Sequence, residues 1–193
     1  MQERAQKSIL VVSGTDKLRE ALSSLLPCAE FVLYTAASCA EARRMLLRCQ
    51  YDVILISAPL PDEFGTTFAL DLAQRNSSGV ILLVRGSLFE EICAKVESYG
   101  VLTVEKPTPR PVLYAAIRMA AAMRARLARA EAQTQSLTAK MEEIRIVNRA
   151  KWVLIKYLNI DEAQAHRHIE KQAMDRRLSK REVAEKIIST YEG

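Results

Sequence analysis

The sequence lacks the features that mark secreted and membrane-spanning proteins. No Cys-x-x-Cys pair occurs among Cys28, Cys39, Cys49 and Cys93, which argues against a zinc or redox motif, so we expect reduced thiols packed among apolar neighbours. No apolar run approaches the roughly 18 residues of a transmembrane helix, and residues 1–4 contain no apolar start of a signal peptide. We therefore expect a cytoplasmic protein without a membrane partner.

The motifs of catalysis are missing as well. The chain contains no glycine-rich phosphate loop, no nucleophile elbow and no metal-binding cluster of residues. His166 and His168 lie two residues apart in a predicted helix, so their rings point to different faces and make a poor metal pair. We expect no enzymatic activity, no metal and no cofactor.

The composition is that of a globular protein with an uneven charge. Of 193 residues, 49% are hydrophobic and 26% charged, which suits one or two folded domains. Residues 1–117 hold 12 Lys+Arg against 13 Asp+Glu, or −1, and residues 118–193 hold 16 against 10, or +6. This surplus favours an anionic partner at the C-terminal end, with nucleic acid the first candidate, although solvated helix faces give the same count.

Short apolar runs alternate with amphipathic segments up to about residue 110. The runs lie at 8–12, 31–34, 53–56, 80–84 and 101–104. Nearly continuous apolar strands separated by helices indicate a parallel sheet covered on both faces. Asp16, Ser38 and Ser87 precede the intervening helices as N-caps. The sequence therefore predicts a five-stranded, doubly wound α/β domain, a fold that places its sites at the carboxyl ends of the strands.

No proline or glycine occurs between Pro111 and Gly193, so nothing interrupts a helix that begins at Pro111 and extends for roughly 70 Å at 1.5 Å per residue. Alternating steps of three and four residues define a seam, nine of whose eleven members are apolar: Leu113, Ala116, Ala120, Met123, Leu127, Ala130, Thr134, Leu137, Met141, Ile144 and Asn148. This heptad pattern predicts a coiled coil that joins two copies into a homodimer. A helix that folds back onto its own chain is the alternative.

The C-terminal third is predicted to be a small helical module. The segment 159–161 forms a turn and cap, a helix follows over 162–177, and Ser179 and Glu182 form a capping box that starts the last helix. We therefore expect three parts: an α/β domain over 1–112, a coiled-coil linker helix over 113–138 and a helical module over 139–193.

A family resemblance covers about residues 7–125. The segment from Asp52 to Gly65, which contains Pro59-Leu60-Pro61-Asp62, and the Lys106-Pro107 pair after the fifth strand resemble a response-regulator receiver, a flavodoxin-like fold. The resemblance implies a phosphate-accepting aspartate at the end of the third strand and two Mg²⁺-binding acids at the end of the first. It also implies a hydroxyl residue ending the fourth strand and a lysine ending the fifth.

Most of this equipment is missing. Ser57 replaces the phosphoacceptor, Ser13 and Gly14 replace the metal-binding acids, and Val84 replaces the hydroxyl residue, so only Lys106 remains. We predict a pseudo-receiver that is not phosphorylated on aspartate and whose surface receives a regulatory protein partner or forms part of the dimer. Lys106 either contacts its loop or, with Arg85, binds a small anion.

A second resemblance covers about residues 139–191. The chain matches the ANTAR domain in order and spacing at Ala150, Lys151, Leu154, Ala165, Ala173, Val183 and Ala184. Trp152 replaces a residue that is usually glycine in the family, and His168 replaces an aliphatic one. We expect Trp152 to pack against the third helix, and a ring presented for base stacking is the alternative.

The ANTAR resemblance implies a transcription antitermination regulator that binds paired hairpins in nascent leader RNA as a dimer. Sequence-specific RNA readers target unpaired loops because the base edges are exposed there. The predicted contacts are basic side chains around the three-helix junction: Arg149, Lys151, Arg176, Arg177, Lys180 and Arg181. Two alternatives stay open: a protein-binding adaptor without RNA, and a DNA-binding regulator whose last two helices form a helix-turn-helix.

Overall fold

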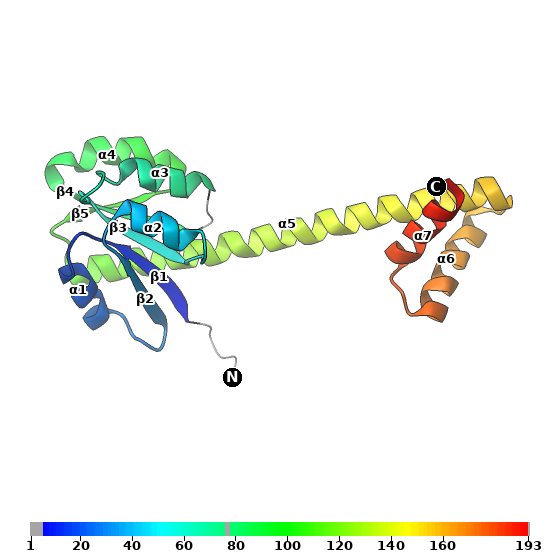
Figure 1. The fold of residues 1–193 in the computed structure, drawn as a ribbon, viewed down its shortest axis with the longest axis horizontal. Helices are drawn as coiled ribbons and strands as arrows, with labels where there is room; N and C mark the ends of the chain where they lie inside the picture. The colour runs from blue at the N-terminus through cyan, green and yellow to red at the C-terminus, as the bar shows by residue number, and fades with distance from the viewer. Residues whose placement is uncertain (1–5, 76–77, 193) are drawn as a thin grey trace. The chain divides into compact units, whose positions relative to one another are not determined.

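The computed structural model describes residues 6–75 and 78–192 and divides into two compact units, Met1–Arg129 and Ala130–Gly193 (Figure 1). In the described part of the chain, no helix is both long and apolar enough to cross a membrane. Each unit has its own hydrophobic core.

The first unit is built on a five-stranded parallel sheet. Its strands are β1 (Lys7–Val12), β2 (Phe31–Ala36), β3 (Val53–Ser57), β4 (Gly79–Arg85) and β5 (Leu102–Lys106), in the order β2-β1-β3-β4-β5. β1, β3 and β4 occupy the middle of the sheet, and their side chains are buried on both faces. The predicted α/β fold class is confirmed.

Helices cover both faces of this sheet (Figure 1). They are α1 (Lys17–Leu25), α2 (Cys39–Leu46), α3 (Thr66–Arg75) and α4 (Phe89–Val96), with the 3₁₀ turns η1 (Gly86–Leu88) and η2 (Glu97–Tyr99) on either side of α4. Of the three predicted N-caps, only Ser38 is confirmed: its side chain accepts a hydrogen bond from the Glu41 amide. Asp16 makes no side-chain capping bond, and Ser87 lies inside η1 instead of capping α4.

The helix α5 (Arg110–Leu158) is 49 residues long. Its first turns pack on the sheet, where Leu113, Ala116, Ile117, Ala120 and Ala121 are buried. Leu113, the predicted first member of the dimer seam, is therefore part of the core of its own chain. The expected domain boundary at residue 112 falls within the part of α5 that covers the sheet.

The later members of the predicted seam are exposed. Met123, Leu127, Leu137, Met141 and Ile144 have exposed fractions between 53% and 69%. Large apolar side chains spaced along one helix in this way remain available to a partner.

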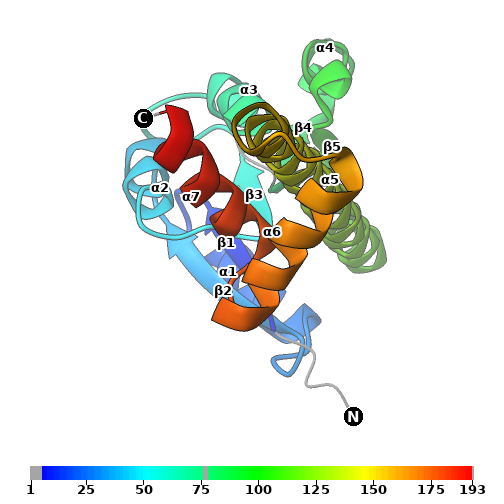
Figure 2. The same ribbon diagram turned by 90° about the vertical axis from the view of Figure 1, so that its right-hand side faces the viewer.

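The second unit consists of the end of α5 with α6 (Glu162–Arg176) and α7 (Lys180–Glu192), and Figure 2 shows α6 and α7 nearest the viewer. Its core contains Ala150, Val153, Leu154, Ala165, Ile169, Ala173, Val183, Ala184 and Ile187.

Caps fix both turns of this unit. Asp161 accepts a hydrogen bond from the Gln164 amide, and the Gln164 side chain accepts one from the Asp161 amide. The predicted box of Ser179 and Glu182 is also present, since each side chain accepts a hydrogen bond from the other residue's amide.

The contact between α5 and β4 generates the first prediction. A Cβ atom at Gly79 would lie 2.8 Å from the carbonyl oxygen of Ala120 and 3.0 Å from its Cβ. Gly79→Ala must push helix and strand apart, so we expect it to destabilise the first unit by about 1–3 kcal/mol in urea unfolding. Met119→Ala, an exposed position on the same helix, should change stability by no more than about 0.5 kcal/mol. Equal effects of the two variants would contradict this packing.

Candidate functional site

The carboxyl ends of the strands carry the residues of the predicted degenerate pocket. Ser57 ends β3 and Lys106 ends β5, and the Lys106 ammonium donates hydrogen bonds to the Ala58 carbonyl oxygen and, at 3.3 Å, to Ser57 Oγ. Burial lowers the pKa of Lys106, and the nearby positive charge of Arg85 lowers it further. The ammonium therefore faces neutral oxygens of the loop after β3 in place of a carboxylate.

The end of β1 is closed by the same loop. Ser13 Oγ donates to the Thr15 carbonyl oxygen at 3.0 Å. A Cβ atom at Gly14 would lie 3.1 Å from Cγ of Pro61, so the proline ring already fills the space next to Gly14. Val84 is fully buried in the core. The five positions predicted for the pocket therefore hold one cation, no carboxylate and little free room.

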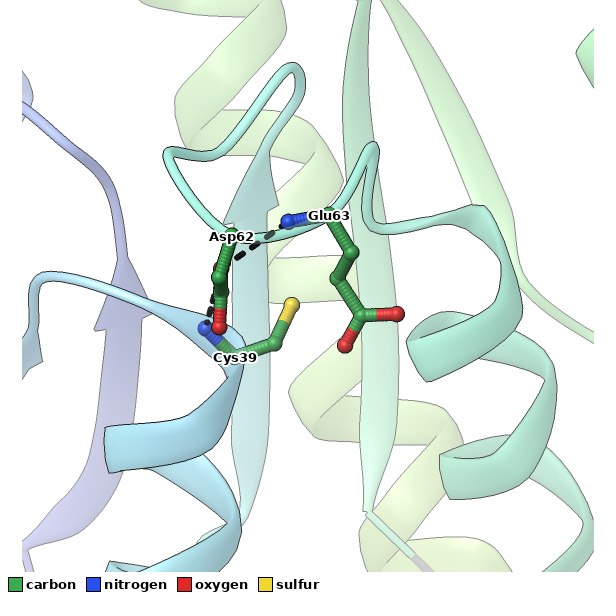
Figure 3. Close-up of side chains that lie close together, drawn as sticks. All are labelled: Cys39, Asp62 and Glu63. Carbon is green, nitrogen blue, oxygen red and sulfur yellow. Dashed lines mark hydrogen bonds between the residues drawn. The ribbon is translucent and has the colours of Figure 1, made fainter.

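A neighbouring cluster contains Cys39, Asp62 and Glu63 (Figure 3). The Asp62 carboxylate accepts hydrogen bonds from the amides of Cys39 at 3.1 Å, Ala40 at 2.9 Å and Glu63 at 3.1 Å. These bonds tie the loop after β3 to the first turn of α2, and they lower the pKa of Asp62.

The ligand atoms of this cluster lie within 4.8 Å of one another, a spacing that a metal ion could use. However, burial raises the pKa of the Cys39 thiol, and the adjacent Glu63 carboxylate raises it further. A thiol must lose its proton to bind a metal, and the oxygens of Asp62 already accept backbone hydrogen bonds. The cluster is therefore better suited to fixing the loop than to holding an ion.

The six predicted RNA contacts fall into separate places on the second unit. Arg176, Arg177, Lys180 and Arg181 gather at the turn between α6 and α7. Arg149 lies at the other end of α7, where its guanidinium donates to Glu192 at 2.6 and 3.0 Å. Since α7 has 13 residues, the two groups are about 20 Å apart along its axis. The predicted cluster is thus only partly assembled.

Several of these cations already have carboxylate partners. Lys180 pairs with Glu170 at 2.7 Å and Arg181 with Glu185 at 2.8 Å. Lys151 pairs with Glu162 at 3.0 Å, and its side chain is only 16% exposed, which favours a role in holding α5 to the start of α6. Among residues 6–75 and 78–192, no carboxylate pairs with Arg176 or Arg177.

The prediction that Trp152 packs against the third helix is wrong. Its side chain is 71% exposed. It lines an open groove of about 760 Å³, together with Glu142, Arg145, Ile146, Asn148, Arg149, Val153, Ile155, Lys156 and Glu192. Sequence reasoning missed Arg145 and Lys156 here, although their helical spacing from Arg149 and Trp152 places all four on one face of α5.

The other unusual position, His168, is partly buried, and its Nε2 lies 2.7 Å from Nε2 of Gln172. His166 instead lies 3.2 Å from a Glu170 carboxylate oxygen. The two histidines therefore have different partners, as their spacing predicts.

The Asp62 cap generates a pH prediction. A carboxylate whose folded pKa lies below its ordinary value of 3.8 stabilises the fold above that value, and this contribution is lost as the pH falls through the folded pKa. We expect Asp62→Ala to lower the unfolding midpoint of the first unit at neutral pH, and the difference from wild type to shrink in acid. Asp16→Ala is the control, because Asp16 also precedes a helix but makes no capping bond. A difference independent of pH would contradict the assignment.

Known proteins resemble this chain in both of its units. Residues 135–188 match the ANTAR domain family model. The chain is 24% identical over 139 residues to "Transcriptional regulatory protein PdtaR" of Mycobacterium tuberculosis, an alignment that covers 72% of this chain and 68% of that protein.

Solved structures resemble the first unit. A signal receiver domain of an HD domain-containing protein from Pseudomonas fluorescens Pf-5 has a TM-score of 0.58 at 24% identity, covering 67% of this chain and 95% of that one. The chemotaxis response regulator CheY4 of Vibrio cholerae has a TM-score of 0.53 at 20% identity, covering 60% and 99%. At this level of identity, the likeness establishes the fold alone. The chain therefore combines a receiver-like fold in its first unit with a match to the ANTAR domain over residues 135–188 in its second.

Proposed function

We propose that the chain is a cytoplasmic transcription antitermination regulator that binds paired hairpins in nascent leader RNA as a dimer. The observation that carries this proposal is the ANTAR match over residues 135–188, which lies within residues 118–193, the segment that holds the positive charge surplus. A relative named as a transcriptional regulatory protein supports it.

The turn between α6 and α7 is the best candidate for the main RNA contact. Arg176, Arg177, Lys180 and Arg181 are all exposed there. Exposed ion pairs such as Lys180–Glu170 contribute at most about 1 kcal/mol, so a phosphate can replace the carboxylate at small cost. Arg176 and Arg177 have no such competitor within the described residues, and a guanidinium suits phosphate oxygens and base edges.

The exposed part of the seam supports dimerisation, with the buried Leu113, Ala116 and Ala120 left out. Met123, Leu127, Leu137, Met141 and Ile144 present apolar side chains along α5, and pairing two copies would remove this surface from water. A dimer offers two ANTAR modules to two hairpins, and tethering raises the effective concentration for the second binding event.

The receiver-like unit is proposed to act without phosphorylation on aspartate. Ser57 stands at the acceptor position, Pro61 fills the space next to Gly14, and Lys106 already binds the Ala58 carbonyl oxygen. Mg²⁺ needs hard oxygen ligands, typically carboxylates, and the predicted pocket positions supply none. The contact of Lys106 with its loop is therefore favoured over an anion site.

A protein-binding adaptor remains a second candidate because the first unit has an apolar groove of about 430 Å³. It is lined by Phe89, Leu102, Thr103, Val104, Glu105, Val112, Ala115, Ala116 and Met119. A regulatory protein that inserts apolar side chains here would give the pseudo-receiver a role without phosphate chemistry.

RNA binding separates the two candidates. We expect the full chain to bind a two-hairpin RNA more tightly than the same RNA with altered loops. Both affinities should fall as salt rises, because each protein cation that neutralises a phosphate releases a salt cation from the RNA. Arg176→Ala should weaken binding several-fold and reduce the salt slope by about one. Lys140→Ala, an exposed lysine of α5 outside the predicted contacts, is the control.

Equal or absent binding to the two RNAs would leave the charge as a generic surface and favour the adaptor. Sedimentation of the same samples tests the dimer, and a monomer at micromolar concentration, unchanged by RNA, would contradict it.

Incubation with acetyl phosphate and Mg²⁺ tests the receiver-like unit. We expect intact-mass measurement to detect no phosphorylation of the wild-type chain. Ser57→Asp should also stay unmodified, because it restores the acceptor but not the carboxylates that hold Mg²⁺. Phosphate bound to an aspartate of the wild-type chain would overturn the proposal.

A further inference from the structure

The chain has a single tryptophan, and its side chain projects from α5 of the ANTAR unit with 71% of its surface exposed. The buried side of this stretch of helix is formed by Ala150, Val153 and Leu154, all in the core of the unit. At 100° per residue, Trp152 points well away from Ala150 and Leu154. The ring therefore contributes little to the folded core.

Basic side chains flank the ring along the same face of α5. Arg145, Arg149, Trp152 and Lys156 follow one another at steps of four, three and four residues, which aligns them in one stripe. All four line the groove of about 760 Å³. An aromatic platform between cations along a groove is the arrangement with which proteins bind unpaired nucleotides.

Two of the flanking cations make only exposed ion pairs, and the third, Lys156, has its Nζ 5.2 Å from the centroid of the Tyr157 ring. Arg145 is 82% exposed and lies 3.6 Å from Glu142, a weak contact. Arg149 pairs with Glu192 at 2.6 Å, and this pair is exposed enough for a phosphate to compete with it. Within the described residues, no hydrogen bond, ion pair or ring contact occupies the indole.

We propose that Trp152 stacks on an unpaired RNA base while Arg145, Arg149 and Lys156 contact the phosphates on either side. This site rests on the proposed RNA-binding function and adds a second contact region to the turn between α6 and α7. It also gives a role to the replacement of the family's usual glycine by tryptophan.

Charge favours RNA over a second copy of the chain as the occupant. The groove holds three cations against two carboxylates, Glu142 and Glu192, so it attracts a polyanion. A symmetric contact between two copies centred on Trp152 would place the same three cations of each copy near one another, and like charges facing across an interface oppose association.

The test uses the full chain and the emission of its only tryptophan. We expect binding of the two-hairpin RNA, or of a short oligoadenylate, to quench this emission, because stacking brings the base into contact with the indole. Trp152→Ala and Trp152→Leu should bind the hairpin RNA roughly tenfold to hundredfold more weakly, whereas Trp152→Phe should retain most of the affinity. Met174→Ala is the control, since Met174 is 78% exposed in the same unit and does not line the groove.

The outcomes separate this site from the wider function. Loop-dependent binding by wild type with unchanged affinity of Trp152→Leu, or with unquenched emission at saturation, would overturn the stacking site and leave the RNA-binding function intact. If the emission of Trp152 shifts with protein concentration in the absence of RNA, the ring contacts a second copy of the chain, and the stacking site would be overturned. Absence of binding to either RNA would overturn both proposals. Thermal unfolding of the four variants should match wild type, because both side chains are exposed.

Discussion

Both units depend on α5, because side chains near its start lie in the core of the first unit and side chains near its end lie in the core of the second. Ile117 and its neighbours complete one face of the sheet, and Leu154 lies in the core of the ANTAR unit. One helix without proline or glycine thus supplies side chains to two separate cores. Between them, apolar side chains that neither core covers stay exposed. The proposed pairing of α5 with a second copy of the chain rests on these side chains.

In the receiver-like unit, three contacts hold the loop after β3. Pro61 packs near Gly14, the Asp62 carboxylate accepts hydrogen bonds from the first amides of α2, and Lys106 donates to the Ala58 carbonyl oxygen. This loop is therefore held by apolar packing and by backbone amide and carbonyl groups.

Much of the fold could be predicted from local patterns, because runs such as 53–56 and 80–84 and the absence of helix breakers after Pro111 act over short distances. The side-chain directions that decide function depend on contacts distant in sequence. The spacing of Leu113 fits a dimer seam, but its side chain packs on the sheet of its own chain. Asp62 caps α2 by accepting hydrogen bonds from the amides of residues 39 and 40, and Arg149 donates to Glu192; both sets of partners are distant in sequence. Trp152 lies in a stretch where Ala150, Val153 and Leu154 are buried, and only its helical spacing from Arg149 and Lys156 indicates that it lies on the exposed face.

The turn after α6 places Arg177 in the left-handed region, with φ of 54°. Glycine adopts this conformation freely, whereas a residue with a Cβ atom pays roughly 1–2 kcal/mol for it. A change to glycine here would relax the backbone and at the same time remove a guanidinium from the most basic turn of the unit. Glycine at this position would favour thermal stability, whereas arginine keeps the positive charge. A more stable module would therefore carry less charge at this turn.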